Sequence, residues 1–227
     1  MKNTSPSSPF SPASFIDTFA YERSLKEQGF LHIAGVDEAG RGPLAGPVVA
    51  GCVIFSSHCA THLYQDSKKI TARQRDILFE KLHNSEAALG VGIADPAEID
   101  RINILQASLL AMQRAVQDCT KKSGLSPDFL LVDGTFQVPM ELPQKTLTKG
   151  ESKSASIAAA SIVAKVTRDR LMVEYGLQYP QYNFQQHKGY PTKAHRVALA
   201  DLAPLLCTEK PLRAFENFFR KIYRRSR

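Results

Sequence analysis

The sequence lacks tryptophan and has only four cysteines among its 227 residues, none of them in a C-x-x-C pair. This spacing argues against a zinc knuckle. No run of 18 apolar residues occurs, and no apolar segment of the signal-peptide kind follows Lys2. Cys52 and Cys119 fall in apolar periodic segments, which indicates buried free thiols in a reducing compartment. We therefore expect a cytoplasmic protein without a membrane span.

Acidic residues are fewer than basic residues in this chain. The 29 Lys and Arg residues exceed the 22 Asp and Glu residues, which gives a net charge of +7 and a pI near 9.3. Such a balance favours polyanionic partners, nucleic acid above all, although a basic protein with scattered surface charge is the alternative. The hydrophobic content of 43% suffices for the core of one large domain.

Strand-like and helix-like segments alternate along the chain. We expect strands at residues 31–37, 47–55, 88–94 and 129–133, and helices at 14–28, 72–83, 99–119 and 154–177, with short helices beyond 179. Thr71 and Gln74 predict a capping box at the start of the second helix. The alternation predicts an α/β domain, in which functional residues gather at the carboxyl ends of the strands.

Two adjacent acids end the first predicted strand. Asp37 and Glu38 precede the turn Gly40-Arg41-Gly42, whose glycines allow the backbone to approach a ligand closely. Buried carboxylates are costly unless a cation or hydrogen bonds stabilise them. Because strand side chains alternate between faces, both acids serve one site only if the strand bends at Glu38 or Glu38 offers its carbonyl. An acidic turn without function is the alternative.

Two further acids occupy unusual places. Asp133 ends another apolar strand, and Asp169 has apolar neighbours at helical spacing, so we expect it within the buried stripe of its helix. Pairing with Arg168 or Lys165 is the structural alternative for Asp169. Together with the acids of the first strand, these residues form an oxygen-only ligand set that suits Mg²⁺ or Mn²⁺. Two such ions can stabilise both the attacking and the leaving oxygen in phosphodiester cleavage.

Several segments match one known family in its order. They are GVDEAGRGP at 35–43, DSK at 66–68, LVDG at 131–134, SASIAAASI at 154–162, AKVTRD at 164–169 and HKGYPT at 187–192. With these motifs the chain resembles ribonuclease HII, the bacterial type 2 ribonuclease H, over about residues 20–200. The related type 3 enzymes carry an extra N-terminal domain, for which the residues before the first strand are too few.

The resemblance implies a ribonuclease H-like mixed sheet flanked by helices, with an added helical C-terminal region. Residues 19–200 would form the catalytic domain, 1–18 a disordered Ser/Pro-rich extension, and 201–227 a helical segment with a basic tail. It also implies a monomeric, metal-dependent endoribonuclease that acts on nucleic acid. Its substrates would be the RNA strand of RNA/DNA hybrids and single ribonucleotides embedded in duplex DNA.

By motif position, the resemblance makes Asp37, Glu38, Asp133 and Asp169 the catalytic carboxylates that bind two Mn²⁺ or Mg²⁺ ions. The Gly40-Arg41-Gly42 turn would line the ribose and phosphate at the junction between RNA and DNA. Tyr190 would stack on the sugar at the DNA side and help to test for a 2′-hydroxyl.

Two lysines complete the expected substrate contacts. Lys68 lies in a matching motif, and Lys153 precedes a helix whose first amides could hold a phosphate. Plain N-capping by Ser152 or Ser154 is the alternative for that segment. A catalytically silent binding module and a metal-dependent DNA nuclease or resolvase are the competing functions.

Overall fold

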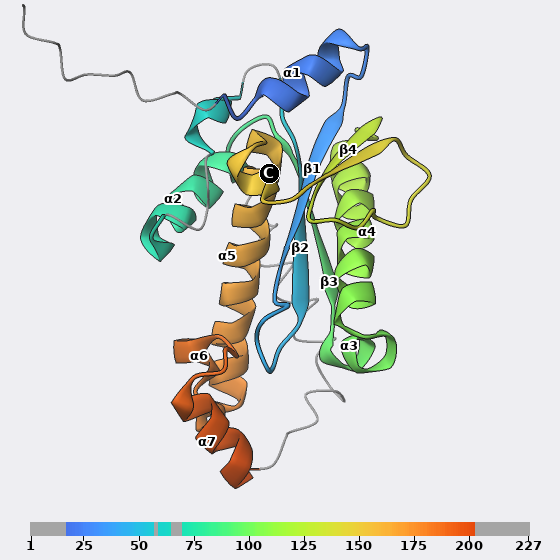
Figure 1. The fold of residues 1–227 in the computed structure, drawn as a ribbon. Coiled ribbons are helices and arrows are strands. Elements are labelled where there is room, and N and C mark those ends of the chain that lie inside the picture. The colour runs from blue at the N-terminus through green and yellow to red at the C-terminus, as the bar shows by residue number, and fades with distance from the viewer. Residues whose placement is uncertain (1–16, 57–58, 65–69, 203–227) are drawn as a thin grey trace, which may run out of the picture.

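A computed structural model describes residues 17–56, 59–64 and 70–202. A five-stranded mixed sheet in the order β3-β2-β1-β4-β5 forms its centre (Figure 1). The strands are β1 (Ile33–Ala39), β2 (Val48–Ile54), β3 (Ala88–Ala94), β4 (Phe129–Asp133) and β5 (Gln144–Leu147). β1 pairs antiparallel with β2 and β2 with β3, whereas β4 lies parallel to both β1 and β5. The predicted α/β fold is confirmed.

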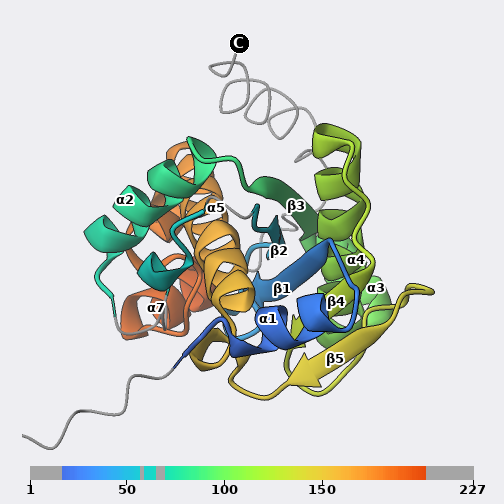
Figure 2. The same ribbon diagram turned by 90° about the horizontal axis from the view of Figure 1, so that it is seen from above.

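Helices cover both faces of this sheet. They are α1 (Ala20–Glu27), α2 (Ala72–His83), α3 (Pro96–Ile102), α4 (Ile104–Ser123), α5 (Ala155–Gln178), α6 (Phe184–His187) and α7 (Lys193–Leu202), with 3₁₀ turns η1 (Thr61–Leu63), η3 (Gly150–Ser152) and η4 (Pro180–Tyr182). Seen from above, α4 covers one face and α5 the other, with α2 outside α5 (Figure 2).

Helix α5 lies unusually close to the sheet. A Cβ atom at Gly35 would stand 2.1 Å from the carbonyl carbon of Ser156, and one at Gly51 would stand 2.3 Å from the carbonyl oxygen of Ala160. Only glycine permits this contact between the helix backbone and β1 or β2. The close approach fixes the position of α5 along its own axis relative to the strands, and with it the position of each α5 side chain.

Most of the expected elements are confirmed, but one helix is divided. The expected helix over residues 99–119 is two helices, because Asn103 adopts a φ of 71° between α3 and α4. Its side-chain oxygen accepts hydrogen bonds from the amides of Leu105 and Gln106 and so starts α4. The capping box of Thr71 and Gln74 at α2 is present as predicted.

A buried carboxylate ties α1 to the start of α5. Glu22 is 2% exposed and accepts hydrogen bonds from the hydroxyls of Ser154 and Ser156, both at 2.6 Å, and from the Ser156 amide at 3.0 Å. Ser154 also caps α5 by accepting from the Ile157 amide. The N-capping alternative for this segment is therefore realised by Ser154.

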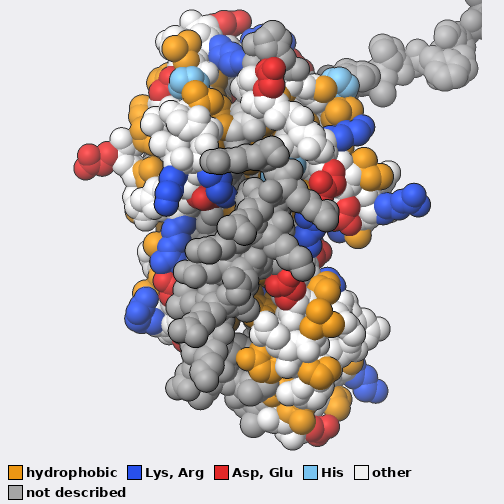
Figure 3. Space-filling model, turned by 180° about the vertical axis from the view of Figure 1, so that it is seen from behind, with side chains coloured by type: hydrophobic (Ala, Val, Ile, Leu, Met, Phe, Trp, Pro, Cys, Tyr) orange, Lys and Arg blue, Asp and Glu red, His pale blue; other side chains and the backbone are white. Residues whose placement is uncertain are grey.

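Several expectations lie outside the described residues, namely the disordered extension up to residue 16, Lys68, and the basic tail within 203–227. None of the helices in the described ranges combines the length and apolar character needed to cross a membrane. On the coloured part of the face in Figure 3, Lys and Arg side chains lie interspersed with Asp and Glu.

Candidate active site

Asp37 lies within the sheet, where β4 brings Asp133 beside it. Val36 pairs with Val132 in the parallel ladder, so the next residue of each strand is an aspartate. Asp37 is only 4% exposed, accepts a 2.7 Å hydrogen bond from the Glu38 amide and is also hydrogen-bonded to the Ser161 side chain of α5. The structure thus places Asp37 of β1 beside Asp133 at the end of β4, the two acids that the sequence placed at strand ends.

The charges of these acids act on one another. Burial raises the pKa of Asp37 well above its usual range, and the charges of Glu38 and Asp133 raise it further. Burial likewise raises the pKa of Glu38, and the charge of Asp133 adds to this, while Arg41 opposes the rise. Crowded carboxylates of this kind favour binding of either a proton or a cation.

Glu38 remains part of β1, which continues through Ala39 instead of ending at residue 37 as predicted. Its carboxylate accepts a 3.2 Å hydrogen bond from the Arg41 guanidinium, which is 48% exposed. Arg41 therefore stands at the rim of the acidic site, with capacity to contact an anion from solvent.

Asp133 is held from the other side by η3. The Gly150 amide donates a 2.6 Å hydrogen bond to Asp133 Oδ1, and Glu151, the next residue, is a carboxylate only 4% exposed. Glu151 was not predicted as a site residue, because its segment was interpreted only as a phosphate site or a helix cap. The signal that could have indicated it is an acid four residues before a strongly apolar helix.

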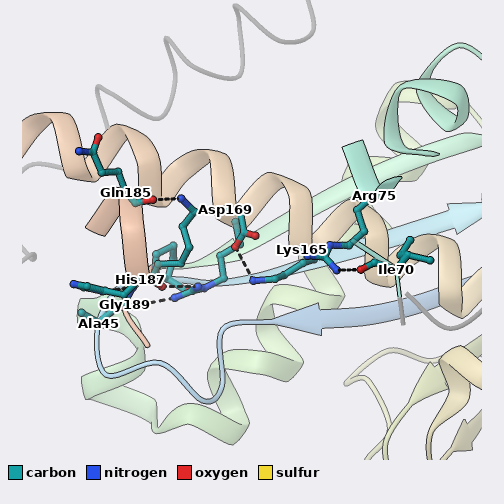
Figure 4. Close-up of polar contacts among 11 residues, drawn as sticks. Ala45, Ile70, Arg75, Lys165, Asp169, Gln185, His187 and Gly189 are labelled. Carbon is teal, nitrogen blue, oxygen red and sulfur yellow. Dashed lines mark hydrogen bonds and ion pairs between the residues drawn. The ribbon is translucent and has the colours of Figure 1, made fainter. Parts of the chain in front are cut away.

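Asp169 differs from the other acids. The prediction that it is buried in the α5 stripe is wrong: its side chain is 26% exposed and accepts a 2.7 Å hydrogen bond from Lys165 (Figure 4). Its neighbour Arg168 is fully buried instead. Pairing with Lys165 was the structural alternative. Ser161 is the α5 residue that bonds to Asp37. Asp169 lies eight residues further along the helix, which corresponds to about 12 Å along its axis.

The Gly40-Arg41-Gly42 turn lies beside Tyr190. A Cβ atom at Gly42 would lie 3.9 Å from Cε1 of Tyr190, a residue that is 37% exposed. Lys165 Nζ lies 5.2 Å from the centre of the same ring. Lys153 is exposed at the end of η3. These are groups of the kind that contact a sugar-phosphate chain.

The donor set fits a hard divalent cation. As the side chains stand, no group of three or more His, Cys, Asp or Glu residues within 17–56, 59–64 and 70–202 is arranged to hold an ion. Glu38 is engaged with Arg41, and Asp133 with the Gly150 amide. A cation would nevertheless relieve the mutual repulsion of the carboxylates near Asp37. Their oxygen-only donor set suits Mg²⁺ or Mn²⁺ and not zinc.

The family model and the curated relatives both indicate ribonuclease HII. The family model of ribonuclease HII matches residues 34–213. The ribonuclease HII of Desulfotalea psychrophila is 56% identical over 185 residues, which are 82% of this chain and 82% of the relative. That of Geobacter sp. (strain M21) is 52% identical over 196 residues, which are 86% of this chain and 84% of the relative.

A solved structure agrees with this result. The crystal structure of ribonuclease H2 from Pyrococcus horikoshii OT3 superposes with a TM-score of 0.60 at 28% identity, and the match covers 73% of this chain and 83% of that one. The mixed sheet flanked by helices is thus the ribonuclease H-like fold that the motifs implied. The chain belongs to the ribonuclease HII family, the endoribonucleases that hydrolyse the RNA of RNA/DNA hybrids.

Proposed function

We propose that Asp37, Glu38 and Asp133 bind two Mg²⁺ or Mn²⁺ ions and that the protein also incises duplex DNA at single ribonucleotides. The observation that carries the metal site is the parallel pairing of β1 with β4, which sets Asp37 beside Asp133 with Glu38 next in the chain, so that their charges raise the pKa of Asp37. When bound, the ions supply charge stabilisation to the attacking and leaving oxygens of phosphodiester hydrolysis. The protein supplies the ligands and positions the scissile phosphate.

The neighbouring residues bind and orient the substrate. Arg41 donates to Glu38 at the rim of the site, where its remaining N–H groups can contact the scissile phosphate. Gly42 leaves the backbone open beside the Tyr190 ring, so that a sugar can rest against both. A ribose in this place presents a 2′-hydroxyl that a deoxyribose lacks, which is the chemical basis for discrimination.

The fourth carboxylate has two candidates. Asp169 is the one that the family motif indicates, but it bonds to Lys165 and lies about 12 Å along α5 from Ser161. Glu151 is buried and follows the Gly150 amide that binds Asp133. Mn²⁺ titration calorimetry of Asp169→Asn and Glu151→Gln separates them, since loss of a direct ligand lowers ion affinity in the absence of substrate.

Further substrate contacts come from basic residues outside the acidic site. The exposed Lys153 and, by motif alone, Lys68 contact phosphates of the substrate, with the net charge of +7 favouring duplex binding. We further propose that the protein works as a monomer, because a duplex can reach the exposed side of Tyr190 without a second copy of the chain, and in the cytoplasm, because Cys52 and Cys119 are buried free thiols.

Cleavage of matched duplexes tests the proposal. The substrates are a duplex with one embedded ribonucleotide, an RNA/DNA hybrid and an all-DNA duplex, each with Mg²⁺, Mn²⁺ or chelator. We expect cleavage of the first two, none of all-DNA, and none with chelator. Asp76→Asn on α2, whose side chain is 55% exposed, is the control carboxylate variant. Binding without cleavage would instead support a silent module, and cleavage of all-DNA would support a DNA nuclease.

A further inference from the structure

Arg168 carries a charge in the interior of the protein. Its side chain is fully buried on α5, and burial lowers its pKa. Nε donates to the carbonyl of Pro47 at 3.0 Å, Nη1 to that of Lys188 at 2.9 Å and Nη2 to that of Ala45 at 3.1 Å. A buried guanidinium is costly, and it is retained where its fixed fork of donors meets several acceptors at once.

These carbonyls belong to two turns that are far apart in the sequence. Ala45 and Pro47 lie in residues 40–47, the first turn, and Lys188 lies in residues 188–190, the second turn. The amide of Leu44 also donates directly to the carbonyl of Gly189 at 2.9 Å. Figure 4 shows Ala45 and Gly189 together beside the helix that carries Asp169. Arg168 thus spans the point where the two turns meet.

The local backbone is built around this side chain. A Cβ atom at Gly40 would lie 2.7 Å from Arg168 Nε, and one at Gly46 would lie 3.2 Å from Nη2. Both glycines also have positive φ angles, 116° and 94°. The first turn therefore needs glycine both for its own conformation and to leave room for the guanidinium.

The same guanidinium lies beneath Tyr190. Arg168 Cζ is 5.8 Å from the centre of the Tyr190 ring, within the range of a cation–π contact. From the other side, His195 Nδ1 lies 3.0 Å from the Tyr190 carbonyl. The ring thus has its position set by the second turn, and Arg168 fixes that turn relative to the first.

We infer that Arg168 is a positioning residue for substrate recognition: it locks the two turns together so that Gly42 and Tyr190 present one continuous surface to the ribose–deoxyribose junction. The inference rests on the proposed function of that surface. Arg168 itself is buried and contacts neither the substrate nor the ions. It acts on recognition through the turns, and so its removal affects KM for the junction more than kcat.

The test compares Arg168→Lys and Arg168→Met with the same changes at Arg170. Arg170 is a matched control on the same helix, since it bonds to Glu80 at 3.0 Å and lies 4.6 Å from the centre of the Phe79 ring, on the α2 side. We expect Arg168→Lys to raise KM for the single-ribonucleotide duplex by about tenfold or more, because lysine cannot span three carbonyls. Its kcat should change by less, and both Arg170 variants should stay near wild type.

Two measurements without substrate complete the experiment. Hydrogen exchange of the Leu44 amide should quicken about tenfold or more in Arg168→Lys, while strand amides stay protected. Mn²⁺ affinity should remain that of wild type. Unchanged Leu44 exchange, a fall in kcat alone, or loss of cooperative unfolding in both Arg168 variants would overturn the inference. Absence of metal-dependent cleavage by the wild type would instead overturn the proposed function.

Discussion

The acids on β1 and β4 and the guanidinium of Arg168 are both buried charges beside α5, yet their surroundings differ. Asp37 has the negative charges of Glu38 and Asp133 near it, which raise its pKa. Arg168 donates to three carbonyl oxygens that belong to the protein itself. The repulsion among the acids is therefore relieved by an added cation or a proton, whereas the donors of Arg168 already have acceptors within the protein. Under the proposed function, the acids bind the ions and Arg168 holds the recognition surface in place.

Removing a carboxylate gives the largest expected effect. Asp37→Asn and Asp133→Asn should each lower kcat by at least about a hundredfold, because metal stabilisation of transition-state charge is worth several kcal/mol. Single-turnover cleavage of an RNA/DNA hybrid measures this loss, with Asp76→Asn as control. A near-normal rate in either variant would contradict the assignment of that carboxylate to the active site.

Tyr190→Ala should have the next largest effect and should separate the substrates. Stacking on an aromatic ring is worth about 1–3 kcal/mol, or roughly 5- to 150-fold in kcat/KM. A single embedded ribonucleotide offers only one junction, whereas a hybrid offers many backbone contacts, so the first substrate should lose more. Tyr190→Phe should be milder. An equal loss on both substrates that follows a drop in Tm would make Tyr190 a core residue.

The stability of the metal-free protein tests the repulsion directly. Because the folded-state pKa of Asp37 is raised, the folded state keeps its proton longer than the unfolded state, and stability falls as the pH rises through that range. Asp37→Asn should therefore raise the Tm in chelator at pH 7, by about 2–4 °C for each kcal/mol of repulsion removed. The gain should shrink when Mn²⁺ is added. A lower Tm in chelator would show that Asp37 is stabilised by its hydrogen bonds alone.

The smallest effect concerns the second turn. His187 accepts from the Gly189 amide, contacts the Tyr182 carbonyl at 2.7 Å and stacks on His195 at 4.3 Å. Burial chiefly lowers its pKa, with His195 and Lys188 adding to the shift and the Tyr182 carbonyl opposing it.

This histidine thus stabilises the fold above about pH 6.5, and the contribution is lost as the pH falls through the lowered folded-state pKa. Between pH 7 and pH 5, His187→Asn should lose less Tm than wild type does. His62→Asn, at an exposed position, is the control. Identical pH profiles for wild type and His187→Asn would contradict this.

Local sequence signals predicted most of the fold. Apolar runs ending in an acid identified β1 and β4, and the parallel pairing then brought Asp37 and Asp133 together. β5 was not identified, because it is a short edge strand of sequence QKTL without an alternating pattern. The division at Asn103 was missed because the apolar spacing continues across it. Periodicity reports repeating faces and is insensitive to a single residue with positive φ.

The arrangement on α5 could not be predicted for a different reason. Asp169 and Arg168 are neighbours, and the apolar residues around them are so numerous that either could face inward. What decides between them is the set of carbonyls from residues 45, 47 and 188, which lie 20 or more positions away in the sequence. A helical pattern contains no information about such acceptors.

The glycine contacts between α5 and the sheet have a consequence for how this enzyme family can change length. The α5 backbone touches β1 and β2 at Gly35 and Gly51, and further along the same helix Arg168 reaches both turns. Inserting or deleting one residue between Ala160 and Arg168 would rotate Arg168 by about 100° and shift it about 1.5 Å along the axis. Natural insertions and deletions should therefore be rare in that segment and in the two turns that Arg168 contacts, residues 40–47 and 188–190. They should accumulate in surface connections that make neither contact.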